Sequence, residues 1–136
     1  MLTKVMVTGI TGYIGQHCGA ELLRQGYEVI GTVRSMEKAD IVREGIARVA
    51  PIDNLTFCET NLLSDEGWKE AMDGCAYVLH VASPFIIANP ADENEMISPA
   101  VDGTLRVLSA AKANGVNRVV LTSSLIAIIA GKLSGL

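Results

Sequence analysis

Aromatic residues, basic clusters and paired cysteines are scarce in this sequence, and each scarcity excludes a class of protein. Phenylalanine, tryptophan and tyrosine make up 4% of the 136 residues, so any core must be built from aliphatic side chains. The net charge is −4, and no basic cluster interleaved with aromatic residues occurs, which argues against nucleic-acid binding. The three cysteines, Cys18, Cys58 and Cys75, form no Cys-x-x-Cys pair, so they indicate a reduced, cytosolic protein without a metal site.

Long apolar stretches are also missing. The longest run, LIAIIAG at 125–131, is far shorter than the roughly 20 residues that span a bilayer. The N-terminus lacks the apolar stretch of a signal peptide. We therefore expect a cytoplasmic protein with no membrane partner. The length and the hydrophobic content of 49% suit one domain with a substantial core.

What the sequence does contain is a regular alternation of strand-like and helix-like segments. The strand-like segments are 4–8, 28–34, 54–60, 75–83 and 117–124, and the helix-like segments are 13–25, 36–49, 64–74 and 92–114. Alternating elements of this kind form a parallel sheet with helices on both faces. The sequence therefore predicts an α/β fold, a Rossmann-type doubly wound parallel sheet cut short after about five strands, with 1–136 as one domain.

The apolar positions predict which faces are buried. Segments 4–8, 75–83 and 117–124 are nearly continuous apolar runs, as in strands covered on both sides. Ser64 is expected to cap the helix at 64–74. The helix faces expected to be buried carry Ile14, Cys18 and Leu22 in the first helix, Ile41, Ile46 and Val49 in the second, and Ile97, Val101, Leu105, Leu108 and Ala111 in the last.

Three glycines spaced three residues apart follow the first strand, in the stretch VTGITGYIGQH at 7–17. Such a turn between a buried strand and a helix is typical of a phosphate cradle. Gly9 permits the tight turn, Gly12 lets the backbone approach a pyrophosphate, and Gly15 lets the helix pack closely. The N–H groups and the dipole of the helix then meet the negative charge. The sequence predicts a dinucleotide site, the alternative being a turn that needs glycine only for a positive φ.

The end of the second strand indicates which dinucleotide is bound. An NAD site usually has an acidic residue there, about 20 residues past the loop. Arg34 stands there instead, with Lys38 four residues on, and a guanidinium suits the 2′-phosphate of NADP. We therefore expect NADP in preference to NAD, the alternative being that Arg34 is a solvated surface arginine.

These stretches resemble the extended short-chain dehydrogenase/reductase superfamily, also called the NAD-dependent epimerase/dehydratase superfamily. The most similar branch is that of dihydroflavonol 4-reductases and related bacterial NADP-dependent carbonyl reductases. VTGITGYIGQH resembles the TGxxGxxG loop, TVRS the end of an NADP-type second strand, and VLHVASPF at 78–85 the motif of the fourth strand. Residues 94–124 resemble the long helix and the fifth strand, so the resemblance covers nearly all of 3–124.

The resemblance implies a role for each matching position. The pyrophosphate would be lined by Thr11, Gly12, Tyr13 and Ile14, the 2′-phosphate bound by Arg34, the adenine flanked by Asn61 and Leu62, and the ribose and nicotinamide side lined by Val81, Ala82 and Ser83. Ser124 resembles the active-site serine, with Ser123 as the alternative. Asn61 stands where the family usually has Asp, and it is equally well explained as a turn residue. We expect His80, in an apolar strand, to be a hydrogen-bonded core histidine and not an acid or base.

The family's chemistry also requires a tyrosine with a lysine four residues later, which lowers the pKa of the phenol. None of Tyr13, Tyr27 and Tyr77 has such a lysine. We therefore expect an NADP-dependent carbonyl reductase or alcohol dehydrogenase, transferring hydride between NADPH and a ketone or aldehyde, of which this chain is a catalytically incomplete fragment. The residues indicate no particular substrate.

Three other interpretations remain open at this stage. The chain could belong to a nucleotide-sugar epimerase or dehydratase, which retains its NAD; it could be a non-catalytic module that senses NADP(H); or it could be the product of a gene remnant. For a fragment, the apolar run at 125–130 and the open edge of the sheet predict marginal solubility or self-association through uncovered apolar surface.

Overall fold

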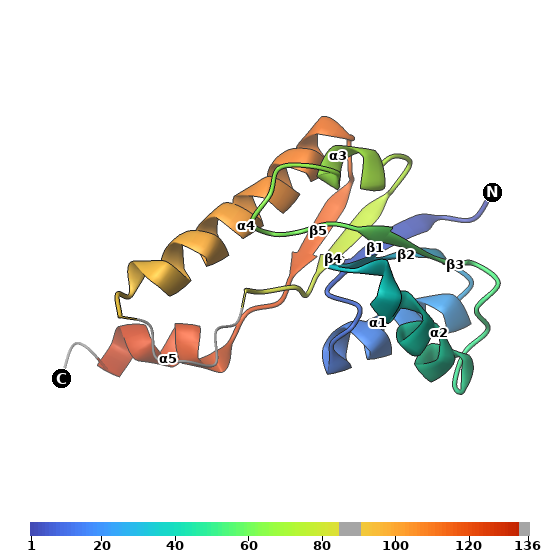
Figure 1. Ribbon diagram of the computed structural model, residues 1–136, viewed down its shortest axis with the longest axis horizontal. Coiled ribbons are helices and arrows are strands. Elements are labelled where there is room, and N and C mark those ends of the chain that lie inside the picture. The colour runs from blue at the N-terminus through green and yellow to red at the C-terminus, as the bar shows by residue number, and fades with distance from the viewer. Residues whose placement is uncertain (85–90, 134–136) are drawn as a thin grey trace.

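A computed structural model describes residues 1–84 and 91–133 and contains a five-stranded parallel sheet with helices on both faces (Figure 1). The strands are β1 (Lys4–Thr8), β2 (Glu28–Val33), β3 (Leu55–Glu59), β4 (Tyr77–His80) and β5 (Arg118–Leu121), in the order β3-β2-β1-β4-β5. The helices are α1 (Tyr13–Arg24), α2 (Ala39–Ala47), α3 (Trp68–Ala71), α4 (Asn94–Ala113) and α5 (Leu125–Leu133), with a 3-10 turn η1 (Met36–Lys38) before α2. The predicted α/β fold with a doubly wound parallel sheet is confirmed.

The sheet has a separate apolar core on each face. Val7, Val29 and Val33 pack with Ile10, α1 and α2 on one side. Met6, Ile30 and Val78 pack with Trp68 of α3 and Val107 of α4 on the other. β1 therefore lies at the centre, paired with β2 and β4 and covered on both faces. Burial raises the pKa of Cys58 to about 11 and also that of Cys75, so both remain thiols at neutral pH.

The helix faces that are buried agree only in part with those predicted. Ile46 and Ala111 are buried and Cys18 and Leu22 pack half-buried against the core, as predicted, whereas the other predicted positions are exposed. α1 buries Gly15, Gly19, Ala20 and Leu23, while the exposed fraction of Ile14 is 52%. α2 buries Ala39, Val42 and Ile46, so Ile46 is correctly placed but Ile41 and Val49 are exposed. α4 buries Gly103, Val107, Ala110 and Ala111, while Ile97, Val101, Leu105 and Leu108 face outward. Small residues let a helix approach the sheet closely, and a search for large apolar side chains overlooks them.

The segment at 64–74 also differs from its prediction. The helix there is only Trp68–Ala71, and it follows Gly67, which has φ +81°. Ser64 does not cap it; the Ser64 hydroxyl accepts a hydrogen bond from the amide of Glu66 in the preceding turn. The loop before α3 is therefore longer than predicted, and it reaches the edge of the cleft described below.

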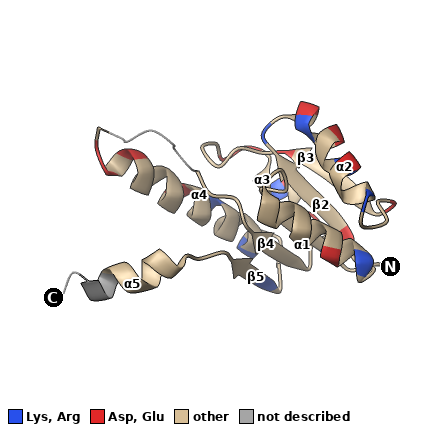
Figure 2. Cartoon of the chain, turned by 90° about the horizontal axis from the view of Figure 1, so that it is seen from below, with Lys and Arg blue, Asp and Glu red and all other residues tan. Residues whose placement is uncertain are grey.

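The C-terminal part of the described chain is poorly covered. β5 was expected to be buried on both faces, but Val120 and Leu121 are about half exposed, at 52% and 51%. α5, where no helix was predicted, lies apart from the sheet (Figure 1). Its residues 125–130 are exposed, and none of them is charged (Figure 2). Across the described ranges, no helix combines the length and hydropathy that crossing a membrane requires. Phe85 of the fourth-strand motif and residues 134–136 lie outside the described residues.

Candidate functional site

A cleft of about 510 Å³ opens at the carboxyl ends of β1, β2 and β4. In doubly wound sheets this edge is where ligands bind, because the connections on either side of the central strand diverge there. Of the residues predicted to bind a cofactor, the cleft is lined by Gly9, Thr11, Gly12, Tyr13, Ile14, Gly15, Arg34, Asn61, Leu62, Val81, Ala82 and Ser83. Lys38, on η1, is not part of the lining.

Two glycines of the loop have no room for a side chain. A Cβ on Gly9, which has φ +67°, would lie 2.8 Å from the Cα of Ala82. A Cβ on Gly15 would lie 2.2 Å from the carbonyl oxygen of Gly9. The loop is therefore in close contact with the start of α1 on one side and with the chain after β4 on the other.

Gly12 is different, because the protein itself leaves space beside it. A Cβ there would meet only the Gly9 carbonyl oxygen, at an ordinary 3.5 Å, and the backbone of Gly12 is extended at φ −81°. Gln16 donates the first hydrogen bond of α1 to the Gly12 carbonyl, so the amides of Tyr13, Ile14 and Gly15 precede it. These amides and the helix dipole make the start of α1 a favourable place for an anion.

Thr8, which is fully buried at the end of β1, holds the opposite wall of the cleft. Its hydroxyl oxygen accepts hydrogen bonds from the amides of Val81 and Ala82, both at 3.0 Å. The same oxygen lies 2.8 Å from Nδ1 of His80, whose exposed fraction is 2%. Burial lowers the pKa of His80 below its usual value. His80 is thus a hydrogen-bonded core histidine, as predicted.

The end of β2 contributes one buried and one exposed side chain. The Thr32 hydroxyl accepts a hydrogen bond from the amide of Gly9 at 3.2 Å and ties the loop to the strand. Arg34 is exposed, lines the cleft, and forms no ion pair within the described residues. Its guanidinium is therefore available to a ligand.

The loop after β3 forms the remaining wall. Asn61 makes the turn that one interpretation predicted, since its Oδ1 accepts the amide of Leu63 at 2.9 Å, and it also lines the cleft. The hydroxyl of Thr60 is buried in this wall and has no hydrogen-bond partner within the described chain. A buried hydroxyl of this kind loses its bonds to water without replacement.

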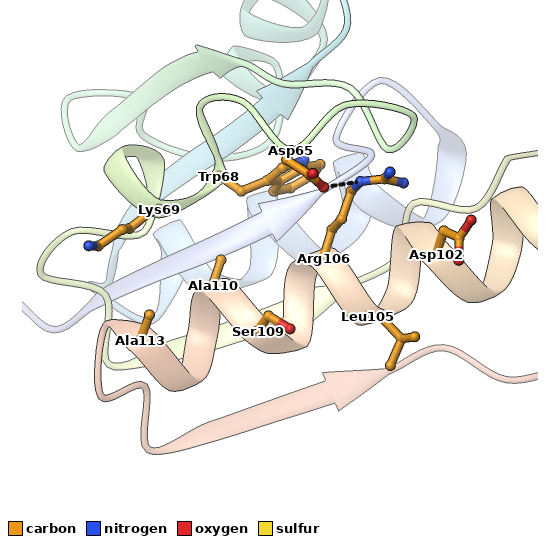
Figure 3. A pocket seen from close by; sticks show the side chains of 9 residues that line it. All are labelled: Asp65, Trp68, Lys69, Asp102, Leu105, Arg106, Ser109, Ala110 and Ala113. Carbon is orange, nitrogen blue, oxygen red and sulfur yellow. Dashed lines mark hydrogen bonds and ion pairs between the residues drawn. The ribbon is translucent and has the colours of Figure 1, made fainter.

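A second pocket, of about 480 Å³, lies between α3 and α4 (Figure 3). Three of its lining residues, Asp65, Trp68 and Arg106, already form hydrogen bonds within the protein. Arg106 reaches from α4 to the carboxylate of Asp65 and to the carbonyl oxygen of Leu62, and the indole of Trp68 donates to the carbonyl oxygens of Asn61 and Ser64. These hydrogen bonds hold the loop at 61–64, part of which lines the first cleft. The first cleft is therefore the stronger candidate for ligand binding.

A protein-family model for the NAD dependent epimerase/dehydratase family matches residues 5–135 of this sequence. The chain belongs to that family. Nucleotide binding at the glycine loop is consistent with the family's name, and the parallel sheet agrees with the solved structures to which the chain is similar.

Three proteins illustrate the similarity to other family members. Dihydroflavonol 4-reductase of Solanum lycopersicum is 41% identical over 90% of this chain and 32% of its own length. Ketoreductase CTB6 of Cercospora nicotianae is 36% identical over 94% of this chain and 38% of its length. Among solved structures, the chain is similar to yeast methylglyoxal/isovaleraldehyde reductase Gre2 complexed with NADPH. The sequence identity is 32% and the TM-score is 0.77, over 90% of this chain and 37% of that one. The chain therefore spans 32–38% of these lengths.

Ser124 lies apart from the cleft lining. It precedes α5, where its hydroxyl accepts the amide of Ile126 at 3.3 Å and its carbonyl accepts the amide of Ala127. It stands three residues after Leu121, the partner of His80 across β4 and β5, so it lies at the same edge of the sheet as the cleft. Its role stays a prediction, as does that of Lys38. The described residues contain no group of three or more side chains suited to a metal ion.

Sequence reasoning missed several residues of the site, namely Thr8, Thr32, Thr60, Leu63, Trp68 and Pro84. Three are threonines at or next to the ends of β1, β2 and β3, where a β-branched residue looks like ordinary strand composition. Their position at the carboxyl edge was the one available signal, because parallel strands bring such residues together.

Proposed function

We propose that residues 1–136 bind NADP(H) and form the cofactor-binding part of an NADP-dependent carbonyl reductase or alcohol dehydrogenase. The observation that carries the proposal is Arg34, an arginine without an ion pair in the described chain, at the end of β2 on the glycine-loop cleft. A guanidinium binds a phosphate by paired, charge-assisted hydrogen bonds. An acidic residue, which would suit the 2′-hydroxyl of NAD, is absent from this position.

The residues present fit a dinucleotide along the whole cleft. The amides of Tyr13, Ile14 and Gly15 would meet the pyrophosphate, in the space that the missing Cβ of Gly12 leaves. Asn61 and Leu62 would flank the adenine, and the unpartnered hydroxyl of Thr60 lies in the same wall. Arg34 would hold the 2′-phosphate. Val81, Ala82 and Ser83 would line the nicotinamide side.

For the whole protein we propose reduction of a ketone or aldehyde. The nicotinamide, when bound, supplies the hydride, and Ser124 would donate a hydrogen bond to the carbonyl oxygen. The names of the similar reductases, and NADPH in the Gre2 crystal, support this class over a nucleotide-sugar epimerase. Since no tyrosine among the 136 residues has a lysine four residues later, we expect this chain to bind NADPH without oxidising it against a carbonyl panel.

The proposal is tested by thermal melts of the chain with NADPH, NADP⁺, NADH or no addition. A ligand that binds only the native state adds about 2.7 kcal/mol of stability at one hundred times its Kd. We expect a rise in Tm with the two phosphorylated cofactors and a smaller one with NADH. Arg34→Ala should remove the difference between NADPH and NADH. The matched control is Arg48→Ala, an exposed arginine after α2 and outside the cleft, which should preserve it.

Gly12→Ala separates cofactor binding from folding. Because the new methyl group meets only an ordinary contact, the variant should fold with a loss of about 1 kcal/mol or less. It should nevertheless lose the shift with NADPH, since the methyl group occupies the pyrophosphate space. A wild-type chain that melts cooperatively but shows no shift with any dinucleotide would contradict the proposed function, and an NADH shift equal to that of NADPH would favour an NAD-retaining epimerase.

A further inference from the structure

The hydrogen bonds around the Thr8 hydroxyl determine where His80 carries its proton. A hydroxyl group has one hydrogen to donate and two lone pairs that accept. The amides of Val81 and Ala82 use both lone pairs, each from 3.0 Å. The single hydrogen is then left for Nδ1 of His80, at 2.8 Å. Nδ1 must therefore be an acceptor, and the neutral imidazole carries its hydrogen on Nε2.

We propose that His80 is a positioning residue for the cofactor cleft: by accepting the Thr8 hydrogen at Nδ1, it aims the Thr8 lone pairs at the two amides that hold the Val81–Ala82 wall. This inference rests on the proposed dinucleotide site. It assigns His80 neither a contact with the ligand nor a proton transfer.

The wall needs such an anchor because it lies beyond the regular pairing of the sheet. β4 ends at His80, and the amides of Val81 and Ala82 both bond to the Thr8 side chain. The same wall touches the glycine loop, since a Cβ on Gly9 would lie 2.8 Å from the Cα of Ala82. A rotation of the Thr8 hydroxyl would turn its lone pairs away from the two amides and weaken the hold on the wall that the glycine loop contacts.

The surroundings of His80 favour the neutral acceptor. The side chain is almost fully buried, and burial is the sole cause of its lowered pKa. The elements packed around β4 carry several charged residues, and none of them contributes to that shift. They are Lys4 on β1, Arg118 on β5, Lys69 and Glu70 on α3, and Glu95, Asp102, Arg106 and Lys112 on α4. An imidazolium would place an N–H against a hydroxyl whose lone pairs are already occupied.

Two variants of nearly equal shape separate this role from simple packing. In His80→Asn, the carbonyl oxygen stands the same number of bonds from Cα as Nδ1 and can accept the Thr8 hydrogen. In His80→Leu, a side chain of the same branching accepts nothing. We expect the Asn variant to bind NADPH as the wild type does, and the Leu variant to bind it about tenfold or more weakly. Equal NADPH affinities in the Asn and Leu variants would overturn the proposal.

A measurement without cofactor keeps the inference testable if the dinucleotide proposal fails or if His80→Leu does not fold. Nitrogen-15 NMR of the wild-type imidazole should show an unprotonated Nδ1 and a protonated Nε2 at pH 7. Hydrogen exchange of the Val81 and Ala82 amides should stay slow in His80→Asn. A protonated Nδ1, or fast exchange of both amides in the Asn variant, would overturn the role of His80. A wild type that shows no NADPH shift, with these NMR signatures intact, would overturn only the proposed function.

Discussion

β1 and β5 are short apolar strands of one parallel sheet, and they differ sharply in burial. Val5, Met6 and Val7 of β1 are at most 1% exposed, whereas Val120 and Leu121 of β5 are about half exposed. β1 has a paired strand on each side and a helical layer on each face, while β5 pairs only with β4 among the residues that the structure describes. Apolar composition therefore gives a strand the capacity to be buried, and the neighbouring elements decide whether it is.

The helices show the same contrast in burial. α1 packs small residues tightly against the sheet and the glycine loop, which gives the loop its fixed shape. α4 packs one side in the same way and leaves a stripe of large apolar residues outward, and the described side chains of α5 are exposed throughout. The cleft at the glycine loop is lined by the start of α1 and by the ends of buried strands, so well-packed elements position its walls.

The largest expected effect comes from Gly9→Ala, compared with Gly115→Ala. Both glycines have a positive φ, so alanine costs about 1–2 kcal/mol at either position. Only at Gly9 does the new Cβ also meet backbone, which adds about 1–3 kcal/mol for overpacking, since nothing lies within 4 Å at Gly115. Urea unfolding should show the larger loss for Gly9→Ala. Equal losses would mean that the loop relaxes away from Ala82.

Two valines on α4 test the difference between its faces. Val107 is fully buried and Val101 is 50% exposed. Val107→Ala should cost about 2 kcal/mol through lost transfer energy and a cavity, whereas Val101→Ala should change stability by about 0.5 kcal/mol or less. Chemical denaturation of the two variants measures both values. A comparable cost at Val101 would show that the outward face is covered in solution.

The sequence was sufficient for the sheet and for most of the cleft, because strong local patterns specify both. The alternation of strands and helices predicted a parallel, doubly wound sheet, and the spacing of the glycines located the loop after β1. What it could not give was the choice of helix face. Gly103 and Ala110 are buried on α4, yet they resemble surface residues beside Leu105 and Leu108. Only the packing of the folded chain distinguishes the faces: a Cβ on Gly103 would lie 3.1 Å from that of Leu62, in the loop after β3.

The site was predictable where a backbone motif defines it and unpredictable where side chains meet from distant strands. Gly9, Gly12 and Gly15 follow from their spacing. The contact of Thr8 with His80 depends on a register in which Thr8 pairs with His80, 72 residues later. Likewise, the burial of Thr32 and Thr60 beside the loop follows from the order of the strands, which no local pattern encodes.

Self-association is the next effect in size. The outward residues of α4, such as Leu105 and Leu108, are expected to lie in an apolar contact between chains. The double variant Leu105→Gln/Leu108→Gln should shift the chain toward monomer in light scattering after size exclusion. The matched control, Arg48→Gln, changes an exposed residue outside this surface and should not. A wild type that is monomeric at high concentration would contradict the expectation.

The smallest effect concerns the boundary between the two regions, where His80 is almost fully buried although Leu121, its partner on β5, is half exposed. Burial lowers the pKa of His80 in the folded chain. The unfolded chain, with an ordinary histidine pKa of about 6.5, then binds more protons than the folded chain as the pH falls below that value. The stability from neutral His80 is fully present above the pKa of the unfolded chain. It is lost as the pH falls toward the pKa of the folded chain, with a slope of at most about 1.4 kcal/mol per pH unit.

The variant His80→Asn tests this effect, because asparagine does not titrate and the exposed His17 is present in both proteins. The stability difference between wild type and His80→Asn, measured by urea unfolding, should therefore move in favour of the variant from pH 7 to pH 5. A stability difference between the two proteins that stays constant from pH 7 to pH 5 would mean that His80 is accessible to water beside β5. The boundary between the buried and the exposed part of the sheet would then lie between β1 and β4.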